Sequence, residues 1–463
     1  MKAGTFLVLA MAASAPALGA SPGERNPRIA QIVGEISQAR IEADIRKLVS
    51  FGTRNSLSDT ASETRGVGAA RRWIKEELER CSKEAGGRLE VAFDEHMIET
   101  GTRVPKPTLF VNVVATLRGE QAESRERLYV VSGHYDSMPS SPVDPDKDAP
   151  GANDDSSGTA VSMELACVMA RHRFDATLVF MAVAGEEQGL LGSEGWAKNA
   201  RAKGLDVAGM LTNDIVGNTR GVDGKVERGR VRLFAEGVPA LKTLPDEVLA
   251  VLRTGGENDL PTRQLARFVK EAGERHVAKM KVDIMWRRDR YLRGGDHFPF
   301  LDAGYAALRF TEPSEDWRHQ HQDVRVVDGV QYGDLAEFVD FAYVADVARV
   351  NAAALAALAL GPSTPREVEM ENVRLEADTT LRWKRNPEPD VAGYRIVWRE
   401  TTAADWQNFR DVGDVARETL VGISKDNFQF GLQAYDRDGN LSVAAYPRPY
   451  RPLPPPPPPP RRP

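Results

Sequence analysis

Hydrophobic residues in the first 360 positions follow two spacings, which indicate two kinds of element. Residues 29–50 carry apolar side chains at helical intervals, namely Ile32, Ile36, Ile41, Ile45 and Leu48. Further helices are predicted at residues 65–80, 158–171, 190–201 and 334–360. Between them lie short, nearly continuous apolar runs at residues 109–117, 128–133, 178–184 and 305–310.

Runs of this kind are typical of strands that are buried on both faces of a sheet. Their alternation with helices predicts an α/β fold, with a mixed sheet between two helical layers, over residues 21–360. No internal repeat interrupts this pattern.

The pattern changes after Gly361-Pro362-Ser363, where short alternating strands replace the helices. Strands are predicted at residues 381–383, 394–398 and 428–435, which favours a small β-sandwich over 366–447. This part resembles a fibronectin type III module through Trp383, Gly393-Tyr394 and the stretch Ala434-Tyr435-Asp436. Residues 448–463 are expected to form a proline-rich, extended tail.

The first twenty residues have the composition of a secretory signal. Lys2 precedes a short apolar stretch, which ends in the small residues Ala17-Leu18-Gly19-Ala20. The stretch is shorter than the roughly 18 residues that a membrane span needs, so cleavage after Ala20 is expected. The sequence therefore predicts an exported protein, periplasmic or secreted. No later segment is expected to be long and apolar enough to cross a membrane.

Composition adds few constraints. The net charge of −6 gives no reason to expect nucleic acid or an anionic membrane as partner. The two cysteines, Cys81 and Cys167, fall in or beside predicted helices. An oxidising compartment would allow them to pair, whereas two buried free thiols are the alternative, and the sequence leaves this open.

Potential metal ligands follow successive apolar runs. His134 comes directly after residues 128–133, Asp154 precedes the helix at 158–171, and Glu186-Glu187 follow 178–184. Asp214 ends a further apolar run, and His319 and His321 lie beyond 305–310.

In α/β sheets ligands gather outside the carboxyl ends of the strands, so these side chains are expected to meet. Adjacent buried carboxylates such as Glu186 and Glu187 are costly unless a cation or a proton accompanies them. Imidazole and oxygen ligands without thiolate suit zinc, with cobalt or manganese as substitutes.

The ordered motifs Gly-His-Tyr-Asp, Gly-Ala-Asn-Asp-Asp-Ser-Ser-Gly, Gly-Glu-Glu-Gln-Gly-Leu-Leu-Gly-Ser, Asn-Asp and His-Gln-His-Gln-Asp resemble those of di-zinc exopeptidases typified by aminopeptidases S and Y. The resemblance covers residues 30 to 360. It implies two zinc ions bridged by Asp154, with His134 and Asp214 completing one site and Glu187 and His319 the other. His321 competes with His319, but the family places its ligand His four residues before an Asp, and Asp323 then selects His319.

The resemblance also implies roles for neighbouring residues. Asp136 would orient His134, Asp155 would be structural, and Glu186 would be the general base for a water that bridges the two metals. Asp296 and His297 would either surround the site or be structural, and residues 220–295 would shape the substrate pocket. The family often has Ser where this chain has Gly295.

The implied activity is an aminopeptidase that removes N-terminal residues from peptides. A carboxypeptidase or a glutaminyl cyclase on the same fold is an alternative. A third alternative is a cell-surface binding protein, in which the C-terminal module contacts polysaccharide or cell wall. A lost ligand would indicate such a protein, and none of the five expected ligands is missing.

Overall fold

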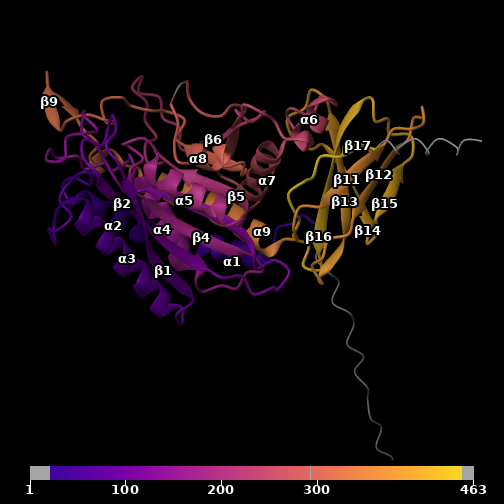
Figure 1. The fold of residues 1–463 in the computed structure, drawn as a ribbon, viewed down its shortest axis with the longest axis horizontal. Helices are drawn as coiled ribbons and strands as arrows, with labels where there is room; N and C mark the ends of the chain where they lie inside the picture. The colour runs from indigo at the N-terminus through magenta and orange to yellow at the C-terminus, as the bar shows by residue number, and fades with distance from the viewer. Residues whose placement is uncertain (1–20, 292, 451–463) are drawn as a thin grey trace, which may run out of the picture.

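A computed structural model describes residues 21–291 and 293–450 of the chain (Figure 1). The expected signal at residues 1–20 lies outside the described residues, as does the expected tail from residue 451 onward. Both therefore stay predictions.

The larger part is built on an eight-stranded sheet with the order β1-β2-β4-β3-β5-β8-β6-β7. Its strands are β1 Leu89–Ile98, β2 Thr108–Leu117, β3 Arg127–His134, β4 Thr177–Val183, β5 Asp206–Asn213, β6 Arg230–Ala235, β7 Lys281–Met285 and β8 Ala307–Thr311. The central strands β4, β3, β5 and β8 run parallel to one another. Three pairs are antiparallel, namely β1 with β2, β2 with β4, and β6 with β8. The prediction of a mixed sheet is confirmed.

Helices cover both faces of this sheet, as the near-continuous apolar strands predict. The helices are α1 Pro27–Gly34, α2 Gln38–Val49, α3 Gly66–Glu84, α4 Ser156–Met169, α5 Leu191–Ala202, α6 Asp246–Leu252, α7 Pro261–His276, α8 His297–Asp302 and α9 Phe341–Leu360. Alternate residues of β3 pack into hydrophobic cores on opposite faces of the sheet. Val131 packs in the core that holds α2, α4 and α9, and Val130 packs in the core that holds α5 and α8. The three-layer α/β arrangement is thereby confirmed.

Two predicted helices differ in extent from those observed. Residues 29–50 form two helices because Ser37 begins a new one, its side chain accepting a hydrogen bond from the Arg40 N–H. The last helix begins at Phe341 rather than Asp334, and Asp340 caps it. Asp334 lies in a loop, where its carboxylate accepts hydrogen bonds from the Asn153 and Asp154 N–H groups.

Helix α9 is long and apolar enough to span a membrane, with a mean hydropathy of 1.4 over its most apolar window. The prediction that no segment after the signal has this length and apolarity is therefore wrong. That window is 94% buried within the protein. Its apolar surface packs against α1, α2, α4 and α7, so α9 is a core helix of this fold.

The C-terminal part consists of two facing sheets, in line with the predicted β-sandwich. One has the order β15-β12-β11-β17 and the other β14-β13-β16. The strands are β11 Arg366–Glu371, β12 Thr379–Lys384, β13 Val391–Glu400, β14 Asn408–Gly413, β15 Arg417–Leu420, β16 Phe428–Asp436 and β17 Arg448–Tyr450. Because β17 pairs with β11, the sandwich continues past the predicted end at 447.

The two parts lie side by side and contact each other through buried ion pairs (Figure 1). Arg399 of β13 binds Asp259 at 2.7 Å, and Arg127 of β3 binds Glu388 at 3.0 Å. All four side chains are at most 6% exposed, so the sandwich is held against the α/β part by desolvated charges in addition to apolar contacts.

Cys81 of α3 and Cys167 of α4 form a disulfide, with their Cα atoms 5.0 Å apart. The question that the sequence left open is thereby answered in favour of pairing. The bond joins two neighbouring helices on one face of the sheet, across 86 positions of sequence.

Candidate metal centre

The expected ligands meet at the carboxyl ends of the central strands. His134 is the last residue of β3, Asp214 follows β5, and Glu186 and Glu187 follow β4. Asp154 stands two residues before α4, in the loop that faces these strand ends. Three parallel neighbours in the sheet thus present their terminal side chains to one point.

The side chains form two groups that share Asp154. His134 Nε2 lies 3.2 Å from one Asp154 oxygen and 3.9 Å from an Asp214 oxygen. On the other side of Asp154, His321 Nε2 lies 2.9 Å from its second oxygen and 3.3 Å from Glu187 Oε2. Within each group the candidate ligand atoms lie within 4.8 Å of one another.

The chemistry of both groups fits a divalent cation. His134 Nε2 and Glu187 Oε1 are buried without a hydrogen-bond partner, although an unpaired buried polar atom is costly. Burial opposes the charged ring, but Glu186, Asp136 and Asp154 raise the pKa of His134 well above its usual value. The carboxylates therefore favour positive charge beside this ring, which a metal or a proton would supply.

The expected ligand His319 does not reach the cluster. Its ring stacks on Phe338 with 3.6 Å between ring centroids, and its Nδ1 faces Asp316 at 3.9 Å. Asp323, which had favoured His319, accepts hydrogen bonds from Ser140 and pairs with Lys147 instead of meeting either imidazole. The structure places His321 beside Asp154 and Glu187, and the choice of His319 is corrected accordingly.

Asp136 contacts both His134 and the loop after β4. His134 Nδ1 lies 3.2 Å from the Asp136 backbone oxygen and 3.5 Å from its carboxylate. Because these oxygens can only accept, the ring proton belongs on Nδ1, which leaves the Nε2 lone pair toward the cluster. The Asp136 carboxylate also accepts from the N–H groups of Glu186 and Glu187, both at 3.3 Å.

Glu186 lies next to the cluster without belonging to either group of candidate ligands. Burial raises its pKa well above the usual value, and the Asp214 and Glu187 carboxylates add to this effect while His134 opposes it. The residue is partly exposed, so solvent can reach it.

Asp155 caps α4 and also accepts a hydrogen bond from the last residue of β3. One of its oxygens accepts from the Gly158 N–H at 2.9 Å, and the other accepts from the His134 N–H at 3.0 Å. The Asp154–Asp155 peptide bond is cis. Asp154 belongs to both groups of candidate ligands, whereas Asp155 belongs to neither.

Asp334 was not singled out from the sequence, since no motif surrounds it. It accepts from the backbone N–H of Asn153 at 2.9 Å and of Asp154 at 2.7 Å. This fixes the loop that presents Asp154 to both groups.

Arg309 was also not singled out, because it stands inside the apolar strand β8. Its guanidinium is fully buried and lies 2.9 Å from Asp214 and 3.1 Å from Asp289. Gly295 makes room for it, since a Cβ there would lie 2.9 Å from Asp214 and 3.3 Å from Arg309 Cδ.

Asp296 and His297 take part in hydrogen bonds outside the two groups. Asp296 accepts from the Ser193 hydroxyl at 2.6 Å, and burial raises its pKa to about 7. His297 Nε2 lies 2.9 Å from the Arg288 backbone oxygen. Of the two interpretations left open by the sequence, these contacts favour the structural one.

Comparisons with known proteins agree with this architecture. The model of "Peptidase family M28" matches residues 112–341. A protein of Leptosphaeria maculans, named probable zinc metalloprotease, is 47% identical over 421 residues, which is 91% of this chain and 97% of the relative. A protein of the same name from Pyricularia oryzae is 47% identical over 422 residues, 90% of this chain and 84% of its own.

Solved structures show the same fold at low identity. LapB from Legionella pneumophila has a TM-score of 0.50 at 19% identity, covering 72% of this chain and 75% of its own. The Legionella pneumophila LapA aminopeptidase also has a TM-score of 0.50 at 19% identity, covering 71% and 74%. The match to the family model includes all the strands that carry the cluster, and the relatives match nearly the whole described chain. The chain therefore belongs to peptidase family M28, whose matched members here are named as zinc metalloproteases.

Proposed function

We propose that this metallopeptidase is an exported aminopeptidase with two zinc ions, which removes N-terminal residues from peptides. The single observation that supports it most is the pair of ligand groups sharing Asp154, with the uncoordinated carboxylate of Glu186 beside them. His134 and Asp214 would hold one ion, and Glu187 and His321 the other. Cobalt or manganese could replace zinc at such ligands.

Bound zinc supplies Lewis-acid polarisation of a substrate carbonyl and lowers the pKa of water. Glu186 accepts the proton of the attacking water and delivers it to the leaving amine, as a general base and then an acid. Asp136 holds the Glu186 backbone and the His134 ring in one arrangement.

The aminopeptidase assignment rests on the motifs, which resemble those of aminopeptidases S and Y. The likeness to LapA supports the fold alone. Export rests on the composition of residues 1–20, and the Cys81–Cys167 disulfide supports it because such bonds persist in oxidising compartments.

The test is metal analysis together with hydrolysis of aminoacyl substrates, each offered with a free and with an acetylated N-terminus. Two zinc ions per chain with cleavage of free N-termini only is the expected result. A single metal ion, or hydrolysis that is indifferent to acetylation, would favour a cyclase or a carboxypeptidase.

Two variants distinguish the general base from a metal ligand. Glu186→Ala should abolish turnover and keep metal content near that of the wild type, whereas Glu187→Ala should lose metal. Loss of metal from Glu186→Ala would show that the two roles are exchanged.

A further inference from the structure

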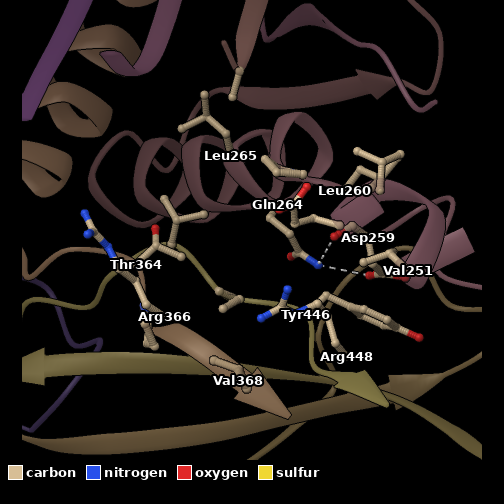
Figure 2. Close-up of a pocket in the computed structure, with 18 of the residues that line it drawn as sticks. Val251, Asp259, Leu260, Gln264, Leu265, Thr364, Arg366, Val368, Tyr446 and Arg448 are labelled. Carbon is tan, nitrogen blue, oxygen red and sulfur yellow. Dashed lines mark hydrogen bonds between the residues drawn. The ribbon is translucent and has the colours of Figure 1, made fainter. Parts of the chain in front are cut away.

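We infer that a pocket between the α/β part and the sandwich binds a small apolar carboxylate, a site separate from the metal centre. The cavity measures about 390 Å³, within the range of small-molecule sites. Figure 2 shows its two walls. Val251 of α6 and Leu260 and Leu265 at α7 form one wall, and Val368 of β11 lies opposite.

The pocket lies at the other end of the sheet from the metal centre. Ala208 near the start of β5 and Ala306 before β8 contribute to its lining. Asp214 follows the end of β5, six residues beyond Ala208. At 3.3 Å per residue this stretch of strand is about 20 Å long, so one small ligand cannot occupy both places.

The pocket holds a half-buried cation that has no acidic partner. Arg448, at the start of β17, forms no ion pair within residues 21–291 and 293–450. It reaches toward Gln264, whose amide oxygen is buried without a hydrogen-bond partner while its amide nitrogen donates to Asp259 at 3.0 Å (Figure 2). A cation against apolar walls is costly unless an anion joins it.

Two of the three acidic residues that line the pocket form ion pairs elsewhere, and none of the three pairs with Arg448. Asp259 binds Arg267 at 3.2 Å and Arg399 at 2.7 Å, and Glu367 pairs with Lys384 at 3.5 Å. Glu247 stands in the first turn of α6, where the helix N-terminus favours a carboxylate. These acids leave the Arg448 guanidinium free to take a ligand.

A carboxylate suits this cation because guanidinium binds it through two parallel hydrogen bonds. The Val and Leu walls suit an aliphatic body of a few carbons beyond it. Such a ligand could be a free hydrocarbon acid or the C-terminal residue of a peptide, which share an apolar group beside a carboxylate.

Isothermal titration calorimetry on the zinc-loaded protein tests this with sodium octanoate and with N-acetyl-L-leucine. One equivalent of at least one of them should bind. Arg448→Met should weaken that binding at least tenfold, since it removes the half-buried guanidinium of the pocket, whereas Arg366, which also lines the pocket, is exposed. Arg410→Met is the matched control, because it removes an exposed sandwich arginine of the same charge and should change binding less than twofold.

A second variant keeps the test independent of Arg448. Val251→Trp fills the cavity from α6 and should also abolish binding, while peptidase turnover of both variants stays within twofold of wild type. Tighter octanoate would identify a hydrocarbon acid as the source, and tighter N-acetyl-L-leucine a peptide C-terminus. The inference would be overturned if neither probe bound, or if binding survived both substitutions. It would also be overturned if only chelation of zinc abolished binding, because the probes would then occupy the metal centre.

Discussion

Replacement of Arg309 by methionine should destabilise the α/β part strongly, because the guanidinium is the cation shared by two buried carboxylates. Arg309 and Asp289 are fully buried, and Asp214 is 5% exposed. Methionine keeps much of the side-chain volume but leaves the carboxylates without this partner. Breaking a buried pair in this way costs about 3–5 kcal/mol.

An independent magnitude comes from Asp289. Burial would raise its pKa, but Arg309, followed by His297 and Arg290, lowers it to about 2 from 3.8. At 1.36 kcal/mol per pKa unit this corresponds to about 2 kcal/mol of stability. Because Arg290 remains in the variant, we expect the free energy of unfolding to fall by about 3 kcal/mol at pH 7, the lower end of the range for a broken buried pair.

The contribution of Asp289 to stability should decrease as the pH falls. The folded-state pKa of Asp289 is depressed, so its contribution is complete above about pH 4 and is lost as the pH falls toward 2. The stability difference between wild type and Arg309→Met should therefore shrink over this acidic window.

Urea unfolding followed by circular dichroism measures the difference, on zinc-loaded and on chelated protein. Arg118→Met is the matched control. Its ion pair with Glu90 is more than half exposed, so its loss should lower the free energy of unfolding by at most about 1 kcal/mol. A loss below about 1 kcal/mol for Arg309→Met at pH 7 would refute the argument, as would an equal loss in the control.

Three further predictions follow from other parts of the fold. His321→Ala should lower zinc content by about one ion per chain whereas His319→Ala should leave it unchanged, as measured by plasma mass spectrometry; the opposite pattern would restore His319 as ligand. Replacing Cys167 by serine should lower the free energy of unfolding by about 2–4 kcal/mol, because the disulfide closes a long loop, and an unchanged urea midpoint would contradict this. Burial raises the pKa of Asp44 to about 7, so the folded protein should lose stability as pH rises from about 4 to 7; Asp44→Asn should reduce that decline in urea midpoints, and an identical pH profile would argue against it.

The sequence by itself determined the architecture and most of the cluster. Apolar strands that alternate with helices allow few arrangements, and residues that follow parallel strands must meet at one edge of the sheet. His134, Glu187 and Asp214 come directly at or after such strand ends, so their approach could be predicted from order alone.

Choosing between His319 and His321 needed the tertiary structure. The two residues are two positions apart in a loop without periodic pattern, and the backbone of His321 adopts a positive φ of 52°. Packing of His319 on Phe338 and the turn at His321 decide which imidazole faces Asp154. Neither contact has a local signal in the sequence.

Long-range partners were likewise decided only by folding. Arg309 stands in an apolar strand, and its carboxylates come from Asp214 and Asp289, which are 95 and 20 positions earlier in the chain. Cys81 and Cys167 meet because α3 and α4 pack on the same face of the sheet. Periodicity records which face of an element is buried, whereas the identity of the groups that meet there depends on how distant elements pack together.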